Sequence, residues 1–152
     1  MTDTRFSSAI HTLIMIAGSK VPLTSEQIAN SVGTNASYIR KLTALLNKGG
    51  IIKGRPGTGG FSLCVAPDSL TLYAIYQAIY DTSRIHIFDI HQNSNDKCIV
   101  GKHIKPVLTK AFCSIEEKAE EELKKQTLSG LMDMMHKEIK EQKNESSNFD
   151  RL

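Results

Sequence analysis

The segment Arg55–Phe61, which reads RPGTGGF, lies between two short apolar stretches, residues 50–53 (GIIK) and residues 61–65 (FSLCV). The two stretches predict short strands, and the glycine-rich segment predicts the turn of a hairpin between them. Glycines cost backbone entropy but let a turn approach a partner where a β-carbon would collide. Pro56 stiffens the entry to the turn, and Arg55 places a positive charge at its base.

Three amphipathic helices are predicted before this hairpin. Residues 4–18 have apolar residues at helical spacing. Thr24 and Gln27 have the spacing of a capping box at the start of a second, short helix that ends at Gly33. A third helix begins after Thr34 and Asn35, ends at a glycine pair, and turns four apolar residues inward: Ile39, Leu42, Leu45 and Leu46.

The opposite face of the third helix carries Ser37, Arg40, Lys41 and Ala44, which form one strip at helical spacing. An ordinary solvated face has the same composition, so the strip alone does not indicate a function. The order of three helices and a hairpin, however, is typical of a winged helix. In that architecture the third helix enters the major groove of DNA, and the hairpin contacts phosphates or the minor groove.

In the second half of the sequence, the spacing of apolar residues predicts a helix around Leu72–Tyr80, and residues 81–101 form a polar segment. A long helix over residues 102–125 carries an apolar seam, and its sequence EEKAEEE (residues 116–122) is interpreted as a solvated face. The seam consists of Ile104, Leu108, Ala111, Ile115, Ala119 and Leu123. Such a seam favours a homodimer, and the alternative is that it covers the winged domain. A shorter helix closes the fold at Leu128, Leu131, Met132 and Met135, and residues 141–152 are predicted to fray.

The whole chain has 152 residues, of which 40% are hydrophobic, which suits one domain with an added arm. We expect a cytoplasmic protein, because the N-terminal residues make a poor signal peptide, no apolar run reaches membrane-spanning length and the number of cysteines is odd. Residues 1–65 contain seven basic and two acidic residues, which indicates a polyanionic partner for this half. No nucleotide-binding loop or catalytic pattern is recognised, so we do not expect an enzyme.

Residues 23–67 resemble the DNA-binding domain of the Rrf2 family of bacterial transcriptional regulators, to which the IscR, NsrR and CymR types belong. The resemblance rests on the Ser-Tyr pair of the third helix, the Lys-x-Gly-apolar-apolar pattern after it, and the wing pattern RPGTGGF. It implies a mainly α fold with a small β-hairpin wing, that is, a winged helix-turn-helix (residues 1–80) followed by dimerisation helices (residues 102–140). It further implies DNA contacts by Asn35, Ser37, Tyr38, Arg40, Lys41, Arg55 and Gly59.

Many members of this family hold an iron–sulfur cluster on three closely spaced cysteines before the long helix. Residues 84–104 contain only Cys98, so we expect no cofactor. A zinc site of Cys98, His91 and His103 fits no standard spacing, and ordinary loop histidines are the favoured interpretation.

Cys98 follows Lys97 and precedes the long helix, and both features favour the reactive thiolate. Its surroundings also resemble cluster-free members whose lone cysteine is linked to oxidant or electrophile sensing. The alternative is a small buried packing residue. Cys64 and Cys113 are predicted to pack in the interior, although Cys113 is also a candidate resolving partner across a dimer seam.

The sequence therefore predicts a homodimeric transcriptional regulator, a repressor, that binds double-stranded operator DNA and responds to a small oxidant or electrophile through Cys98 (the residue 81–101 segment being the sensing loop). Two alternatives stay open. One is an iron–sulfur regulator with non-standard ligands. The other is a winged-helix module that binds protein, which should present apolar residues where this chain has Ser37, Arg40 and Lys41.

Overall fold

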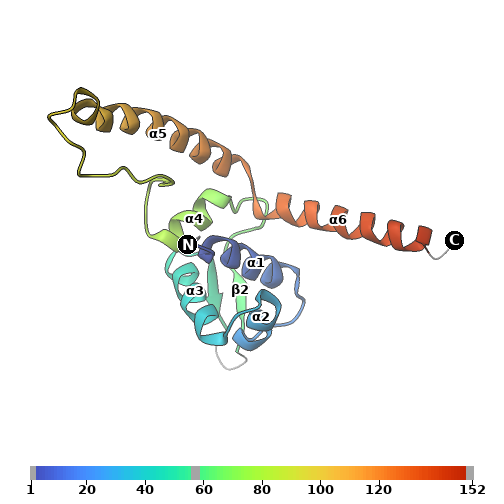
Figure 1. The fold of residues 1–152 in the computed structure, drawn as a ribbon. Helices are drawn as coiled ribbons and strands as arrows, with labels where there is room; N and C mark the ends of the chain where they lie inside the picture. The colour runs from blue at the N-terminus through green and yellow to red at the C-terminus, as the bar shows by residue number, and fades with distance from the viewer. Residues whose placement is uncertain (1–2, 56–58, 150–152) are drawn as a thin grey trace.

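The computed structural model describes residues 3–55 and 59–149. Its winged domain contains α1 (Arg5–Gly18), α2 (Ser25–Val32), α3 (Ala36–Lys48) and a hairpin of β1 (Ile52–Gly54) and β2 (Phe61–Leu63). It is followed by α4 (Leu72–Tyr80), α5 (Ile99–Lys125) and α6 (Leu128–Phe149). Figure 1 shows the winged domain as one compact lobe, with α5 and α6 extending away from it. The mainly helical fold with one small hairpin is the predicted one.

Local signals in the sequence place the ends of α2 and α3. The Thr24 hydroxyl accepts a hydrogen bond from the Gln27 amide at 3.2 Å, and the Gln27 side chain accepts one from the Thr24 amide at 2.9 Å. Gly33 ends α2 with a left-handed φ of 79°. The Asn35 side chain then caps α3 by accepting from the Tyr38 amide at 2.8 Å. The predicted capping box is confirmed, and Asn35 rather than Thr34 caps the third helix.

A single hydrophobic core joins all the helices of the winged domain to the beginning of α6. The predicted inward face of α3 is confirmed, because Ile39, Leu42 and Leu46 are buried and Leu45 packs against them. Burial of these large side chains is the main stabilising contribution to the domain. The largest fully enclosed apolar residues are Leu13, Ile28, Ile39, Leu42, Leu46, Ile52, Leu70, Ile75, Ile79 and Leu128.

The hairpin is short and antiparallel, with Ile52 opposite Leu63 and Gly54 opposite Phe61. The Arg55 amide donates to the Gly60 carbonyl at 2.9 Å and continues the pairing beyond the strands. Gly60 has a φ of 137°, and a β-carbon built on it would lie 2.5 Å from Pro22 Cβ in the α1–α2 connection. Only glycine fits here, so the base of the wing is held against the rest of the domain.

The C-terminal helices are longer than predicted. Helix α5 begins at Ile99, three residues before the expected start, because Cys98 takes an extended conformation and acts as its N-cap residue. Helix α6 runs to Phe149, through residues that were predicted to fray. After Gly130 it contains no helix breaker and many Lys, Glu and Gln residues, which favour helix even without burial.

The junction between α5 and α6 is attached to the winged domain. Thr71 and Thr127 form an isolated antiparallel bridge, in which the Leu128 amide donates to the Leu70 carbonyl at 2.8 Å. The Leu128 side chain is fully buried in the core. The chain therefore leaves the winged domain after α4 and returns to it at the start of α6. Within residues 3–55 and 59–149, no helix combines the length and the apolarity that crossing a bilayer requires.

Gly60→Ala should lower the free energy of unfolding by roughly 1–3 kcal/mol, because the new methyl group would collide with Pro22 and the backbone would be strained. Urea unfolding followed by circular dichroism measures the change. Gly18→Ala is the matched control, since a β-carbon at that position would meet no neighbouring heavy atom within 4 Å. Equal unfolding midpoints for the two variants would show that the contact at Gly60 is unimportant.

Candidate nucleic-acid interface

The exposed strip of α3 has the geometry that the sequence predicts. Ser37, Arg40, Lys41 and Ala44 are all exposed, while the opposite side of the same helix is buried. The strip combines a hydroxyl, two long cations and a small residue, and large apolar side chains are missing from it. Such a surface suits hydrogen bonds and ion pairs with a polyanion such as DNA. It does not suit an apolar protein partner.

The two predicted contact residues at the start of α3 differ from the strip. Asn35 is exposed, but its side-chain oxygen is already used in capping the helix. Tyr38 is partly buried, and its hydroxyl is enclosed without a hydrogen-bond partner among the described residues. The ring packs against the core and supports the position of the helix. The contact between Tyr38 and DNA stays a prediction.

Arg40 is linked to the preceding helix. One of its terminal nitrogens lies 3.2 Å from a Glu26 carboxylate oxygen, and both side chains are more than half exposed. The pKa of Glu26 lies below its usual value, first because of a hydrogen bond from its own backbone amide and then because of Arg40. An exposed ion pair contributes little to stability. In the structure it places the guanidinium beside the carboxylate of α2.

The base of the wing lies in the same lobe as α2 and α3, on the side of the molecule away from α5 (Figure 1). Arg55 and Gly59 are exposed, and Gly59 has a left-handed φ of 55°. The Arg55 amide is bound to the Gly60 carbonyl, and the Arg55 side chain lies on the surface at the base of the wing. Pro56, Gly57 and Thr58, which were predicted to form the tip, lie outside the described residues.

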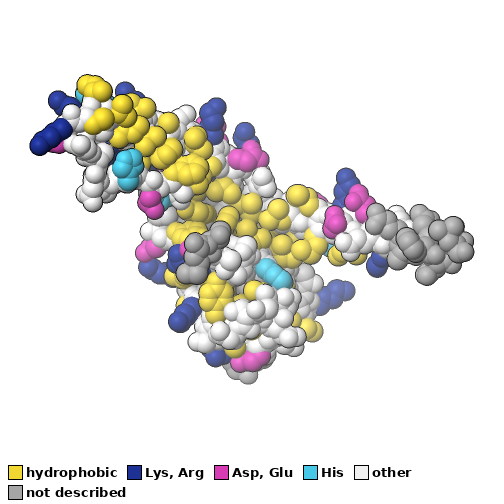
Figure 2. All heavy atoms as spheres, in the orientation of Figure 1, with side chains coloured by type: hydrophobic (Ala, Val, Ile, Leu, Met, Phe, Trp, Pro, Cys, Tyr) yellow, Lys and Arg dark blue, Asp and Glu magenta, His cyan; other side chains and the backbone are white. Residues whose placement is uncertain are grey.

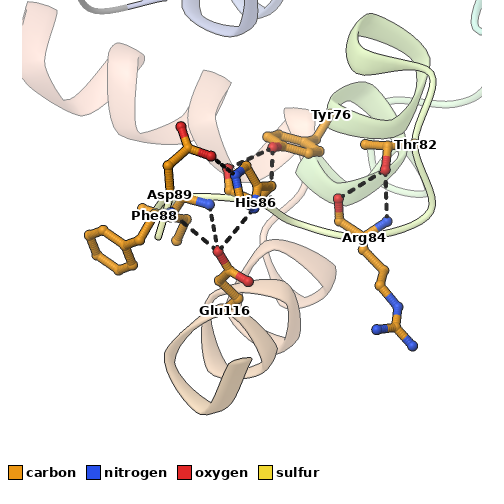
Figure 3. A network of polar contacts seen from close by, with 8 residues as sticks. Tyr76, Thr82, Arg84, His86, Phe88, Asp89 and Glu116 are labelled. Carbon is orange, nitrogen blue, oxygen red and sulfur yellow. Dashed lines mark hydrogen bonds and ion pairs between the residues drawn. The ribbon is translucent and has the colours of Figure 1, made fainter. Parts of the chain in front are cut away.

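The segment between α4 and α5 is attached to α5 by one carboxylate. A Glu116 oxygen accepts hydrogen bonds from the backbone amides of Ile87 at 2.7 Å and Phe88 at 3.3 Å (Figure 3). The Phe88 and Phe112 rings also pack, with centroids 5.0 Å apart. The side chain of Glu116 is only 15% exposed. The interpretation of residues 116–122 as a purely solvated face is therefore wrong at Glu116, which binds backbone donors that no local pattern reveals.

His86 extends this attachment. Its Nε2 lies 2.8 Å from an Asp89 oxygen and its Nδ1 lies 3.6 Å from Glu116. The pKa of His86 is raised above its usual value, chiefly by the hydrogen bond to Asp89. The Tyr76 hydroxyl contacts the backbone of His86 at 3.4 Å, which connects the same point to α4 (Figure 3). The first half of the segment is thus bound to both neighbouring helices.

Cys98 lies at the other end of that segment, as the N-cap residue of α5. It is exposed, so it does not pack in the core of its own chain. The pKa of its thiol is lowered by the backbone amides of Gly101 and Val100, in that order. These amides, rather than the neighbouring Lys97 ammonium, favour the thiolate at this helix start.

The turn before Cys98 is tight. The Cys98 amide donates to the Asn95 carbonyl at 3.3 Å. A β-carbon on Gly101 would come within 2.1 Å of that same carbonyl oxygen, so only glycine permits this turn over the first turn of α5. Cys98 consequently sits on a closely packed backbone although its sulfur is exposed.

The other two cysteines differ from the prediction. Cys64 follows the second wing strand and Cys113 lies in α5, and both are exposed rather than packed inside. Cys64 falls just beyond the short strand, and Cys113 lies on a helix that buries none of its residues in its own chain. Neither element is enclosed enough to bury a small side chain.

Comparison with known proteins gives consistent results. The model of the Rrf2 family, described as an iron-dependent transcriptional regulator, matches residues 2–134. YwnA of Bacillus subtilis, which bears the name of an HTH-type transcriptional regulator, is 36% identical over 132 residues, or 87% of this chain and 97% of YwnA. A crystal structure described as a DNA-binding protein has a TM-score of 0.68 and 34% identity, over 84% of this chain and 98% of its own. CymR, the global cysteine regulator of B. subtilis, shares the fold with a TM-score of 0.64 at 20% identity, over 88% of this chain and 96% of CymR.

The iron named in the family description would need side-chain ligands, and the described residues do not provide a suitable set of them. No group of three or more His, Cys, Asp or Glu side chains within them lies close enough to hold a metal ion. The ring Nδ1 of His103 is hydrogen-bonded to the Ile99 carbonyl at 2.9 Å, within its own helix. Cys98 alone is one thiolate, whereas clusters of this kind are usually held by several.

The lowered pKa of Cys98 predicts its reactivity. The rate of alkylation by iodoacetamide is followed by mass spectrometry across a pH series. The pH at which this rate is half-maximal should be lower for Cys98 than for a cysteine in an unstructured peptide. In concentrated urea the midpoint should return to the peptide value, because the amides at the start of α5 are no longer aligned. Lys97→Gln should leave the midpoint unchanged. Identical midpoints for the folded and unfolded protein would contradict the role of these amides.

Proposed function

The chain belongs to the Rrf2 family of DNA-binding transcriptional regulators, and from this premise we propose that it is a homodimeric repressor. The dimer binds a near-palindromic operator, and its affinity for that operator is controlled through Cys98. The observation that carries the proposal is the exposed polar strip of α3 in the same lobe as Arg55 at the base of the wing. Ser37, Arg40 and Lys41 would contact the major groove, and Arg55 and Gly59 would contact the backbone or the minor groove. Transcription in vitro from a promoter that carries the operator distinguishes repression from activation.

The Arg40–Glu26 pair has a specific consequence for DNA binding. In the free protein Glu26 competes for the guanidinium, and on the complex its negative charge would lie near the phosphates. Glu26 therefore limits affinity, whereas Arg40 and Arg55 supply it. Removing the charge of Glu26 should therefore raise the affinity for DNA, whereas removing the charge of Arg40 should lower it. Opposite effects of this kind distinguish a role of the ion pair in DNA binding from a role in folding.

Arg40→Gln and Arg55→Gln should each weaken operator binding about tenfold, because a contact to a base edge or phosphate is lost. Glu26→Gln should tighten binding, and the affinity of the wild type should fall steeply with salt as counterions are released. The operator is first selected from genomic fragments, beginning with the region upstream of the chain's own gene, and affinities are then measured by fluorescence anisotropy.

Lys118→Gln on α5 is the control, since it removes one exposed cation far from the strip in sequence and fold. Binding that is unaffected by both arginine substitutions would refute the proposed interface. Equal weakening by Glu26→Gln and Arg40→Gln would show that the pair matters only for folding.

The dimer is supported by the exposed apolar surface of α5. None of the 27 residues of this helix is buried within its own chain. Ile99, Val100 and Val107 are 73%, 63% and 60% exposed, and Figure 2 shows hydrophobic side chains along the length of the helix. Such a stripe on an extended helix is stable in water when a second chain covers it. A two-fold dimer would place two α3 helices about one turn of DNA apart, roughly 34 Å.

Val107→Glu and Ile115→Glu should each convert the dimer to a monomer at micromolar concentration, because a charge would be buried in the exposed apolar surface of α5 that the second chain covers. Light scattering coupled to size-exclusion chromatography measures the mass. Thr109→Glu is the matched control, because Thr109 lies on the opposite face of the helix and bonds only to the Lys105 carbonyl of its own turn. A monomeric wild type, or a dimer unaffected by both seam substitutions, would overturn this part of the proposal.

Control through Cys98 is supported by its place in the fold. The sulfur is exposed, so a small electrophile can reach it, while the backbone beneath it is tightly packed between Asn95 and Gly101. The adjacent Ile99 and Val100 belong to the exposed apolar surface that would form the dimer. An adduct on the sulfur would therefore crowd the end of the dimer seam and change the spacing of the two DNA-binding lobes.

The agent would be a quinone or a comparable electrophile. The Cys98 thiolate adds to a ring carbon of the quinone, a new C–S bond forms, and proton transfer to the ring oxygens gives a hydroquinone thioether without any further oxidant. Treatment of the wild type with benzoquinone should lower operator affinity, and Cys98→Ser should keep its affinity after the same treatment. Retained affinity after modification of Cys98, verified by mass spectrometry, would show that this cysteine is no switch. Equal loss in Cys98→Ser would place the switch elsewhere.

A further inference from the structure

A cavity of about 540 Å³ opens between the last turn of α3, Ile51 just before β1, and α4. This volume lies within the range of small-molecule sites in proteins, roughly 300–1,000 Å³. It lies inside the winged domain and includes none of the residues of the α3 strip, the wing base or the Cys98 turn. Its lining consists of Leu45, Lys48, Gly49, Ile51, Val65, Ser69, Leu70, Ala74, Gln77, Ala78, Asp81, Thr82 and Ser83.

The floor of the cavity is apolar and firmly positioned. Ile51 and Leu70 are 3% and 1% exposed and belong to the hydrophobic core. Gly49 approaches α4 so closely that a β-carbon on it would lie 2.7 Å from Ala78 Cβ. The helices that form the two walls are therefore held at a fixed separation, and the floor would accept an aliphatic group without rearrangement.

The rim carries one cation and one anion that face each other. Lys48 Nζ lies 3.4 Å from Asp81 Oδ2, and the two side chains are 72% and 80% exposed. A pair this exposed is held together weakly, so each partner is available to a ligand that offers the opposite charge. Lys48 projects from the end of α3, and Asp81 follows the end of α4.

The backbone on the Asp81 side is held in a defined conformation. Asp81 has a φ of 50° and is the one non-glycine residue with a positive φ among the described residues. The next residues are held by hydrogen bonds, since the Tyr73 hydroxyl donates to the Ser83 carbonyl at 2.8 Å and Thr82 bonds to the backbone of Arg84. Asp81 is the C-cap residue of α4, and this left-handed conformation, in which helices commonly end, fixes the direction in which its side chain leaves the helix.

These features select the charge of a ligand. A simple anion would be attracted by Lys48 but repelled by Asp81. A simple cation would be attracted by Asp81 but repelled by Lys48. A molecule that carries a carboxylate and an ammonium group close together satisfies both, while an aliphatic side chain would fill the apolar floor. We propose that this cavity is a binding site for a small zwitterion with an aliphatic side chain, of the class of free α-amino acids.

Isothermal titration calorimetry on the full chain tests the site without DNA, so its outcome is independent of the proposed function. The probes are leucine, isoleucine, valine and methionine. Isoamylamine and isocaproate are the matched analogues of leucine that lack the carboxylate or the ammonium group. At least one of the amino acids should bind with a Kd of about 1 mM or tighter, and each analogue should bind about tenfold more weakly than leucine. Absence of heat with all four amino acids, or equal affinity for leucine and its analogues, would overturn the proposal.

Two substitutions that each remove one charge test the position of the site. Lys48→Gln and Asp81→Asn should each weaken amino acid binding about tenfold, because one charged contact is lost. Asn also tolerates the left-handed backbone at position 81. Lys118→Gln on α5 and Asp133→Asn on α6 are the matched controls, and circular dichroism verifies that all four variants fold. Binding that survives both rim substitutions unchanged would show that the amino acid binds elsewhere and would refute this site.

Discussion

The burial of Ile39, Leu42 and Leu46 on one side of α3 is the constraint on which the rest of the structure depends. A helix of 13 residues has room for one apolar row and one polar row, and placing the first in the core fixes the direction of the second. The exposed cations of α3 are therefore oriented by the same contacts that stabilise the domain. The last turn of the helix also forms a wall of the cavity beside α4.

A second connection ties the arm to this domain. Leu128 is fully buried, and the Thr71–Thr127 bridge closes the path that the chain makes through α5. The free end of α5 is consequently distant from the domain while its other end is fixed (Figure 1). A displacement at Cys98 would be transmitted along a continuous helix toward this fixed junction. This arrangement gives a physical basis for coupling between the thiol and the DNA-binding lobe under the proposed function.

Polar contacts in the protein serve to position groups more than to stabilise the fold. The Arg40–Glu26 and Lys48–Asp81 pairs are both exposed, and exposed pairs add little to the free energy of folding. Glu116 is different, because it is mostly enclosed and accepts two backbone amides from the segment before α5. That carboxylate replaces the hydrogen bonds that a segment without regular structure cannot make with itself.

The sequence by itself determined the elements whose signals are local. The capping box at Thr24, the left-handed glycine at Gly33 and the inward row of α3 depend on neighbours within one or two helical turns, so they could be predicted from spacing. The polar strip followed from the same periodicity. The long seam of α5 was also visible, since a period of three to four residues persists whether or not a partner is present.

Only the tertiary structure decided which polar and sulfur-bearing side chains are free and which are engaged. The Tyr38 hydroxyl is enclosed, Cys64 and Cys113 are exposed, and Glu116 binds a segment 28 to 29 residues away in sequence. The close approaches at Gly60 and Gly101 likewise join residues from separate elements or turns. Such contacts form between residues that are close in space but separated in sequence. The periodicity of a sequence reports only neighbours within one element, so it does not reveal them.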